Sequence, residues 1–424
     1  MKLIILGGSG DMGSYIVRDV IKFGKIWTRI TIADINEKRS RKLIAEINDP
    51  RLDYEAIDAR NHNNLVKLLK NYDIACSAIG PYYIFGPKII RAAIEAKIPL
   101  VDICDDPDPT AAVLEMDEDA KNAQIPIFIG YGWTPGLTNL MAKHAYDKLD
   151  RGHPVHFDIA WAGGAADSEG LAVIMHVFHA ITGSFPSYQD GKLIDTPAGK
   201  GNVRVNFPAP LGTIGVFDCG HPEPVTIPRF LPEVERCTLK GGLTPDWNNK
   251  ASATFKHFHL LQGPRRKKYV AKFTHLIESL FAVGGIAASS ARVDIYGIFK
   301  DKPVHWVYCT PSITMGELTG YPAAIAAQLY AEGKISEIGV LPPEALSGDA
   351  PNLFFDEMKK RNIEMIFDEN DPLEQFSPPE AYTPGLISKY GLTILVLLFL
   401  AIVLFGVGWL ILTLFSGWFL PNLL

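Results

Sequence analysis

Short apolar runs alternate with longer amphipathic stretches over the first 149 residues of the chain. Six runs rich in β-branched residues span residues 2–6, 29–34, 53–58, 73–79, 98–103 and 125–130. Between them, stretches such as "DMGSYIVRDVIKFG" and "GPKIIRAAIEAK" place apolar residues three and four positions apart, as a helix that lies on a sheet requires. This alternation predicts an α/β domain, a doubly wound parallel sheet of Rossmann type over residues 1–149.

The rhythm then changes to longer, less regular strands that are separated by loops rich in glycine and proline. An inserted α+β domain with a mostly antiparallel sheet, over residues 150–310, is the simplest interpretation. Near its end, "SARVDIYGIFKDKPVHWVYCT" has the pattern of two strands joined at Asp301 and Lys302, which predicts a long hairpin. Two helical patterns follow at residues 320–334 and 350–362.

The end of the chain differs in composition from everything before it. Residues 369–389 are acidic and rich in proline, which predicts an extended linker. From Tyr390 onward the chain contains no charged residue and no histidine. As a helix, residues 391–415 would be about 37 Å long, enough to cross a hydrocarbon core of about 30 Å. We therefore expect a transmembrane helix over residues 390–415 and a short tail at 416–424.

Aromatic residues near both ends of this run, Tyr390, Trp409 and Trp418, are typical of membrane interfaces. A buried core helix is the alternative, but the length and the lack of charge argue against it. At the other end of the chain, Lys2 leads straight into a short strand rather than a signal peptide. With Lys389 beside the run, we expect a single-pass membrane protein whose catalytic domain lies in the cytoplasm and whose partner is the lipid bilayer.

Charge and cysteine content exclude several classes of protein. A net charge of -6 argues against a nucleic-acid partner. The basic run "RRKK" at 265–268 is interpreted as a solvated loop, with docking on anionic lipid as the alternative. Five scattered cysteines without a CxxC pair indicate neither a disulfide framework nor a zinc site. His176 and His179 lie three apart, but no third ligand is near in sequence, so no metal site is predicted.

A glycine-rich loop follows the first predicted strand. In "LIILGGSGDMGS", Gly8, Gly10 and Gly13 satisfy the G-x-G-x-x-G spacing at the mouth of a predicted helix. Such glycines allow a tight turn, a close approach to a pyrophosphate and close packing of the helix on the sheet. Asp34 stands about 20 residues further on, at the end of the second strand, where a carboxylate accepts hydrogen bonds from ribose hydroxyls. A dinucleotide cofactor is therefore predicted.

The choice between NAD and NADP stays open, with NAD modestly preferred. A carboxylate at Asp34 would repel a 2′-phosphate, whereas Lys38, Arg39 and Arg41 follow closely and one of them would attract it. Asp58, at the end of the third strand, is interpreted as a partner of the adenine amino group or, alternatively, as the N-cap of the next helix.

The loops after the fourth, fifth and sixth strands are where chemistry is expected, because ligands of open α/β sheets bind beyond the carboxyl ends of the strands. Gly80 and Pro81 would pass the nicotinamide ribose. Asp102 and Tyr82 are the predicted proton sources for hydride transfer to an imine or a carbonyl. For Asp102 the alternative is a strand-end residue that accepts hydrogen bonds from the loop, and Cys104 is expected to be a small buried apolar residue.

Four residues are expected on the substrate side of the cleft. Tyr83 follows the fourth strand, and Thr134 lies in the loop after the sixth, just before a helix that starts near Leu137. His221 and Glu223 stand in a proline-rich loop of the second domain that is long enough to reach the cleft.

Four segments resemble, in order and spacing, the saccharopine dehydrogenase-like oxidoreductases, which include saccharopine reductases, carboxynorspermidine dehydrogenases and trans-acting enoyl reductases. They read "GGSGDMGS", "GPYYIFGPKIIRAAIEAKIPLVDICDDP", "GYGWTPGLTNLMA" and "GELTGYPAAIAAQLYAEGKISEIGVLPPEAL". The resemblance covers about residues 1–363. It implies a Rossmann domain, an inserted domain that in this family serves substrate binding and dimerisation, and helices over residues 311–368 that return to the Rossmann domain.

The resemblance also implies an NAD(P)-dependent reaction on a small-molecule substrate, in which a secondary amine is formed or cleaved through an imine. The family's cofactor positions correspond to Gly8, Ser9, Gly10, Met12, Asp34, Asp58, Ile79, Gly80 and Pro81. The arginine clamps expected for a dicarboxylate are not obvious, since Arg229 and Arg236 are the only arginines of the second domain to nominate. A reductase of a lipid or isoprenoid at the membrane, and a scaffold that binds nucleotide without catalysis, are the alternatives.

Overall fold

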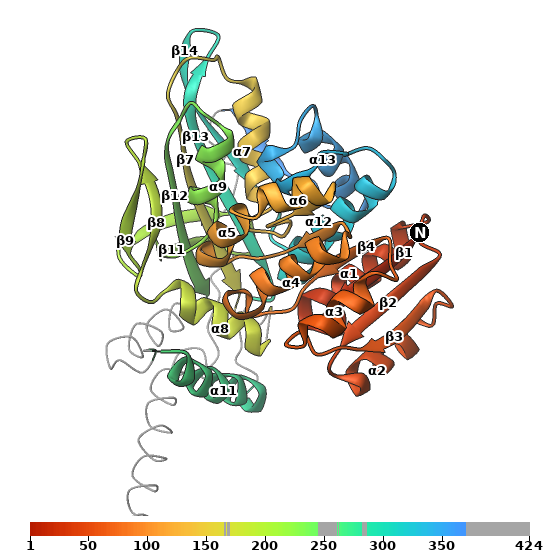
Figure 1. Ribbon diagram of the computed structural model, residues 1–424. Helices are drawn as coiled ribbons and strands as arrows, with labels where there is room; N and C mark the ends of the chain where they lie inside the picture. Colours follow the sequence, from red (N-terminus) through yellow and green to blue (C-terminus); the bar gives the residue numbers. More distant parts are fainter. Residues whose placement is uncertain (165–166, 168–169, 245–260, 262, 282–285, 370–424) are drawn as a thin grey trace, which may run out of the picture.

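The structure is a computed structural model that describes residues 1–164, 167, 170–244, 261, 263–281 and 286–369 (Figure 1). Its first sheet has seven parallel strands in the order β15-β6-β5-β4-β1-β2-β3. They are β1 (Lys2–Leu6), β2 (Arg29–Asp34), β3 (Leu52–Ala56), β4 (Ile74–Ser77), β5 (Leu100–Asp102), β6 (Pro126–Phe128) and β15 (Gly339–Leu341). The six predicted strands are all present, four of them shorter than predicted, and the Rossmann fold is confirmed.

Alternating side chains of β1 fill two cores, one on each face of this sheet. Leu3 and Ile5 belong to one hydrophobic cluster, and Ile4 and Leu6 to the other. This is the period of two that a strand buried on both faces requires. The helices of this domain are α1 (Asp11–Phe23), α2 (Glu37–Ile47), α3 (His62–Leu69), α4 (Tyr82–Ala96), α5 (Pro107–Leu114), α6 (Asp117–Ala123) and α7 (Leu137–Lys148).

The second sheet follows the order β10-β11-β12-β7-β13-β14-β16, and β8 and β9 form a hairpin beside β12. Its strands are β7 (Val155–Gly164), β8 (Ser184–Gln189), β9 (Lys192–Pro197), β10 (Val203–Phe207), β11 (Gly212–Asp218), β12 (Val234–Thr244), β13 (Ser289–Phe299), β14 (Lys302–Cys309) and β16 (Ile366–Asp368). Only β12 and β7 pair in parallel among these strands, so the expectation of a mostly antiparallel sheet is confirmed.

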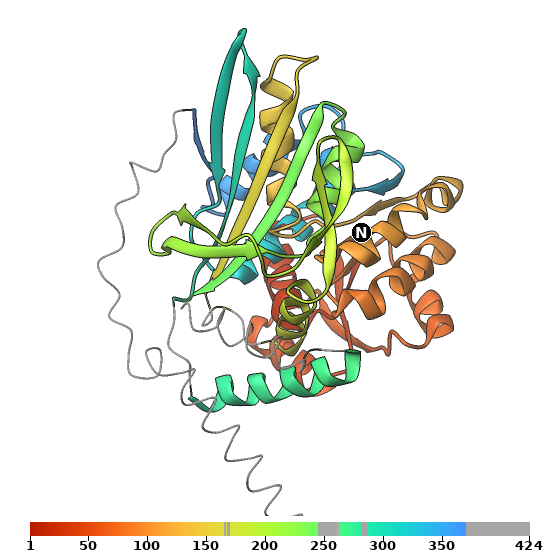
Figure 2. The same cartoon turned by 90° about the vertical axis from the view of Figure 1, so that its left-hand side faces the viewer.

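The predicted hairpin is present and extends from the body as the teal pair of strands β13 and β14 (Figure 2). Its turn residues are Lys300 and Asp301, one position earlier than predicted, with φ angles of 51° and 60°. Two consecutive left-handed residues match the right-handed twist of the flanking strands, which explains the tight connection.

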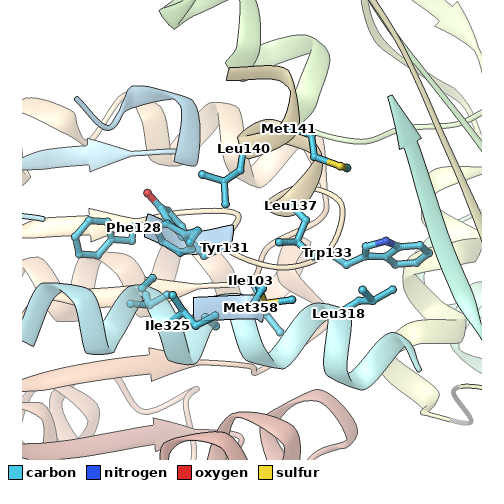
Figure 3. Packing of buried hydrophobic residues seen from close by; sticks show 14 of the residues in the cluster. Ile103, Phe128, Tyr131, Trp133, Leu137, Leu140, Met141, Leu318, Ile325 and Met358 are labelled. Carbon is cyan, nitrogen blue, oxygen red and sulfur yellow. The ribbon is translucent and has the colours of Figure 1, made fainter. Parts of the chain in front are cut away.

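The remaining helices are α8 (Leu171–Ala180), α9 (Glu223–Phe230), α11 (Gly263–Phe281), α12 (Met315–Ala331) and α13 (Ala350–Lys360), with a 3₁₀ turn, η1 (Pro343–Ala345). The α12 helix returns to the first domain and packs on α1, where a Cβ on Gly316 would lie 2.1 Å from the ring of Tyr15. In Figure 3, Leu137 and Leu140 of α7 point toward α12, whose Leu318 and Ile325 face them.

Two sequence-based expectations need correction. Residues 311–368 hold more than returning helices, because β15 joins the first sheet beside β6 while β16 joins the second sheet beside β14. The basic run at 265–268 belongs to α11, which packs against α8, and is therefore not a loop (Figure 1).

Within the part of the chain that the structure describes, no helix combines the length and the apolar character needed to cross a bilayer. Apart from Glu369, the predicted linker lies outside the described residues, as do the predicted transmembrane helix and tail.

Candidate functional site

The glycine loop has the geometry that a dinucleotide needs. A Cβ on Gly13 would lie 2.2 Å from the carbonyl oxygen of Gly7, so only glycine allows α1 to approach the loop this closely. The N-cap of α1, Gly10, has no side chain to occupy the free N–H groups of the first turn. Those groups and the helix dipole point toward the position of a pyrophosphate. The loop therefore fits the predicted cofactor.

Asp34 is held against the loop by its own neighbours. Its Oδ2 accepts a hydrogen bond of 2.7 Å from the Ser9 hydroxyl, and its Oδ1 accepts one of 2.9 Å from the backbone N–H of Asn36. Arg39, at the start of α2, forms an ion pair with Asp11 in the first turn of α1. Among the three cations proposed near Asp34, Arg39 is thus the one placed beside the glycine loop.

Asp58 pairs within its own turn. The Arg60 guanidinium and backbone N–H donate to its carboxylate and hold the pKa of Asp58 at about 2. The N-cap of α3 is Asn61, whose Oδ1 accepts from the N–H of Asn64, so the alternative of Asp58 as a helix cap is wrong.

The other cofactor-side positions lie where the loops of a Rossmann domain carry them. Met12 packs on one face of the sheet and Ile79 on the other. Gly80 and Pro81 are partly buried between β4 and α4.

A buried polar cluster begins at the carboxyl end of β5. Asp102 is 2 % exposed, and its Oδ1 accepts a hydrogen bond of 2.7 Å from the N–H of Cys104. One oxygen of Asp102 therefore accepts a hydrogen bond from the loop, as the alternative interpretation of this residue expects. Its Oδ2 is buried without a partner. Burial, reinforced by Asp105 and Asp106, raises the pKa of Asp102 to about 7.

His176 of α8 joins this loop to the second domain. Its Nδ1 lies 2.9 Å from Oδ1 of Asp106 and 3.2 Å from Oδ1 of Asp105. Burial alone would lower the pKa of His176, but the two carboxylates outweigh it and raise the pKa to about 9. The imidazole is therefore a cation at neutral pH. Burial also raises the pKa of Asp105, to about 7, although His176 opposes the shift.

The second domain contributes the other half of the cluster. Oε1 of Glu223 accepts hydrogen bonds from the hydroxyls of Thr134, at 2.6 Å, and Thr138, at 2.8 Å. Its Oε2 lies 3.7 Å from Nδ1 of His221. The His221 and His176 rings meet edge to face, with their centroids 5.2 Å apart. Residues from both domains therefore converge at the carboxyl edge of the first sheet.

Burial and nearby charge shift the pKa values of Glu223 and His221 in opposite directions. The pKa of Glu223 is raised to about 6 by burial, which outweighs its hydrogen bonds from threonine. The pKa of His221 is held well below its usual range by burial and then by the charge of His176. His221 is therefore neutral at physiological pH. The backbone of Thr134 acts in the opposite direction on the pKa but does not outweigh these two causes.

The predicted catalytic and substrate-side residues lie around this cluster. Tyr82 is 8 % exposed, and burial followed by Asp102 and Asp105 raises its pKa well above the usual value. The backbone N–H of Tyr83 donates to Asp106, and its ring stacks on His179 with centroids 4.4 Å apart.

Sequence reasoning missed His176 as a site residue and left Asp105 and Asp106 without a role. The signal was the pair of adjacent aspartates directly after a strand, together with histidines three apart on a helix. One donor atom from each of these three residues lies within 4.8 Å of the others, so among the described residues they could hold a metal ion. The direct hydrogen bond between His176 and Asp106 satisfies those two groups without one.

Arg229 and Arg236 lie elsewhere. The first pairs with Glu115 and the second with Asp158 on the second sheet. A surface cavity of about 600 Å³ is also remote, because Lys2, Arg29 and Asp73 line it at the amino ends of the first sheet's strands.

Comparison with known proteins agrees with this geometry. The family described as saccharopine dehydrogenase NADP binding domain matches residues 3–128. The carboxyaminopropylagmatine dehydrogenase of a Synechocystis species is 21 % identical over 390 residues, which cover 82 % of this chain and 94 % of that protein. A lipid droplet localized protein of Caenorhabditis elegans is 22 % identical over 142 residues, 31 % of this chain and only 33 % of that protein.

Among solved structures, the apo saccharopine dehydrogenase (L-Glu forming) of Saccharomyces cerevisiae is similar over 87 % of this chain and 99 % of its own, with a TM-score of 0.61 and 14 % identity. This likeness concerns the fold, and it extends through both domains. The matched cofactor domain and the relative that is similar over most of its length point in the same direction. The chain is thus similar to the saccharopine dehydrogenase-like oxidoreductases in its cofactor-binding domain and in its overall fold.

Proposed function

We propose that this protein transfers a hydride between NAD(P) and the carbon–nitrogen bond of an imine or secondary amine in an amino-acid-like substrate. The observation that carries the proposal is the buried acid and histidine cluster at the carboxyl edge of the Rossmann sheet, beyond the loop where the nicotinamide is expected. A bound dinucleotide would supply or accept the hydride. The first turn of α1 and the glycine loop would hold its pyrophosphate, and the loop around Gly80 would border its nicotinamide end.

His176 is suited to supply the proton that reduction of an imine consumes. It is 8 % exposed and charged, and two carboxylates from the facing domain fix its ring. A charged acid with a pKa near 9 remains protonated at neutral pH and can give a proton to a developing amine. Asp102 and Tyr82, predicted from the sequence, border the same cluster, and Asp102 is the second acid of the site.

Cofactor preference belongs to the same proposal. Each oxygen of Asp34 accepts a hydrogen bond from the chain, and the carboxylate keeps further lone pairs for ribose hydroxyls, so Asp34 does not decide between the cofactors by itself. Arg39 is close enough to the glycine loop to exchange Asp11 for a 2′-phosphate. We therefore favour NADP, against the preference for NAD drawn from the sequence.

A lipid substrate has less support, because the convergent groups of the cluster are carboxylates and imidazoles rather than apolar side chains. The scaffold alternative is separated from the enzyme by titration of the full chain in detergent with NADPH and NADH. If neither binds at millimolar concentration, the dehydrogenase function is wrong. If one binds, oxidation of reduced cofactor with mixtures of an amine and an oxo acid tests turnover. Loss of turnover in His176→Gln with cofactor affinity retained supports the catalytic role.

For localisation, we propose that residues 391–415 anchor the protein in a bilayer, with the enzyme on the cytoplasmic side. The support is the charge-free sequence of that run. Cells that express the full chain are fractionated, and the membranes are washed at alkaline pH. The comparison is a variant that combines Leu400→Arg with Ala401→Arg. Anchored protein stays with the membranes, and the variant is released. A homodimer is likewise a proposal, tested by light scattering in detergent.

A further inference from the structure

Glu344 is a buried carboxylate to which the proposed reaction gives no role. It lies in η1, just after β15, within the segment "GVLPPEAL", and it is 2 % exposed. Its Oε2 accepts a hydrogen bond of 2.9 Å from the side-chain amide of Asn139 in α7. Burial raises the pKa of Glu344 to about 7, and the groups that oppose the shift, chiefly Thr226, the local backbone and Asn139, carry no charge. Neutral pH therefore lies close to the point where Glu344 binds a proton.

The orientation of the Asn139 amide is fixed by its other contacts. The backbone N–H of Gly136 donates to Oδ1 of Asn139, at 2.9 Å. Because that N–H cannot accept, the amide oxygen must face Gly136, and the amide nitrogen is left to face Glu344 and the hydroxyl of Thr226, at 3.2 Å. Asn139 is fully buried, so its nitrogen depends on these two acceptors.

A chain of hydrogen-bonding groups leads on from Asn139 to Glu223 of the second domain. Oδ1 of Asn139 lies 3.3 Å from the hydroxyl of Thr138, which lies 2.8 Å from Oε1 of Glu223. A hydroxyl has one proton to donate, but it also accepts. Thr138 can therefore donate to Glu223 while that carboxylate is charged and turn to Asn139 when Glu223 carries a proton.

The two carboxylates differ in how well their surroundings support a charge. Oε1 of Glu223 accepts from two threonine hydroxyls, and the cation of His176 favours its charged form. Glu344 accepts from a neutral amide, and the charge of Glu223 further disfavours its ionisation. Two buried carboxylates that are linked through neutral groups cannot both ionise at low cost. The first proton therefore belongs to Glu344.

Other titratable groups also face the two carboxylates. Tyr131, from the loop after β6, and Cys237 of β12 lie near Glu344, and burial raises the pKa of each well above its usual value, so both are neutral. Glu223 is faced by further members of the cluster, which are His176, His221, Asp105 and Cys219. His176 is the cation of this set, and it lies next to the His221 ring, on the Glu223 side of the chain.

We infer that Glu344 and Glu223 form a buried acid pair that binds its first proton at Glu344. Glu344 is then a positioning residue, because it holds Asn139 and leaves Glu223 charged near His176 with both threonine donors in place. The inference rests on the proposed function only for the effect of the pair on turnover. The pair also joins the two domains, since η1 packs against α7 of the first domain and α9 of the second.

Infrared difference spectroscopy of the full chain in detergent tests the pair without turnover, because a protonated carboxyl group has a carbonyl band that a carboxylate lacks. Spectra are compared from about pH 5 to about pH 9. The band that Glu344→Gln removes should titrate at about pH 7 in the wild type. Glu223→Gln should lower that titration by at least about half a pH unit, because the neighbouring charge is gone. Glu332→Gln is the matched control, since this carboxylate pairs with Lys334 at 2.7 Å, and it should leave the band unchanged.

The pH–activity profile tests the positioning role. Its acidic limb is expected near the pKa of Glu223, which is about 6. Glu344→Leu removes an acceptor of Asn139 and should displace the threonine donors from Glu223, which moves the acidic limb up by about half a pH unit. Glu344→Gln keeps an acceptor and should restore most of that shift. Equal acidic limbs in these two variants would overturn the positioning role.

The acid pair is overturned if Glu344→Gln removes no band that titrates near pH 7, or if Glu223→Gln leaves that titration in place. Should Glu344→Gln fail to fold, Thr138→Val gives an independent test. It removes a donor from Glu223 and should raise the pH at which Glu223 binds its proton by about half a unit, and an unchanged spectrum would break the link. Failure of NADPH and NADH to bind the wild type would instead overturn the proposed function, while the infrared titration still reports on the pair.

Discussion

Two buried clusters of charge in this protein differ in how completely they are satisfied. At the contact of α1 with the end of α13, the Arg361 guanidinium donates to both oxygens of Asp19, at 2.7 and 2.8 Å, and to Oε2 of Glu357, at 2.9 Å. It also lies 4.3 Å from the centroid of the Phe23 ring. Each of these three charged side chains has a partner within the chain.

The cluster around His176 also combines buried carboxylates with a cation, but several of its polar atoms have no partner. Three of its carboxylate oxygens and both nitrogens of His221 are buried without a hydrogen bond. Unsatisfied buried polar groups cost stability, so their concentration at one edge of the sheet indicates a site that a ligand completes. The Arg361 cluster joins two parts of one domain, whereas the His176 cluster lies between two domains.

Among the tests of this comparison, His176→Gln is expected to have the largest effect, a loss of turnover. The amide keeps a hydrogen-bond donor for Asp106 but cannot carry the proton. We expect turnover to fall by about 10²- to 10⁴-fold, the usual contribution of a general acid. The melting temperature should fall, because Asp105 and Asp106 lose their cation, whereas the affinity for NADPH should stay close to wild type. A variant with normal turnover would show that His176 has only a structural role.

The second prediction concerns the satisfied cluster. Arg361→Leu leaves Asp19 buried without its cation, while Glu357 keeps its pair with Lys360, and the variant should lower the free energy of unfolding by about 3–5 kcal/mol. Arg18→Leu is the matched control, because the pair of Arg18 with Glu46 is about half exposed and worth at most about 1 kcal/mol. Chemical denaturation followed by circular dichroism measures both. Equal losses in the two variants would contradict the assignment of stability to burial.

The first domain was predictable because its signals are local. Strand period, helix spacing and the glycine loop with Asp34 each lie within a few tens of residues, and the parallel sheet follows from them. β15 and β16 were missed because each is three residues long and pairs with a strand far away in sequence. The helix at 263–281 was missed because "RRKK" was interpreted by charge alone.

The site was predictable only on the Rossmann side. Asp102 and Tyr82 could be placed from the strand order, since a strand's carboxyl end is visible in the sequence. The contact of His176 with Asp105 and Asp106 spans about seventy residues and depends on how the second domain docks. No periodicity in the sequence reports that docking, so His176 was interpreted as an ordinary core or surface histidine.

The third prediction uses pH to separate the contributions to the His176 cluster. The pKa of His176 is raised from 6.5 to about 9, so its charged contacts stabilise the fold fully below about pH 6.5 and are lost as the pH rises through about 9. Turnover in the reductive direction should fall over the same pH range, which forms the alkaline limb of the pH–activity profile. Asp105→Asn removes one carboxylate and should move that limb down by about one pH unit. His221, Glu223 and Asp106 still face the ring in this variant, so a limb that does not move would assign it to another group.

The smallest effect is expected at the exposed edge of the cofactor loop. Arg39 is half exposed and its pair with Asp11 is a surface ion pair, so Arg39→Ala should change stability by less than about 1 kcal/mol. If Arg39 exchanges Asp11 for the 2′-phosphate of the cofactor, the same variant weakens the binding of NADPH by about two- to fivefold and leaves the binding of NADH nearly unchanged. Arg41→Ala is the control, because Arg41 pairs with Glu37 on its own helix. Fluorescence titration with both cofactors measures the ratio, and an equal loss for NADH and NADPH in Arg39→Ala would return the preference to NAD.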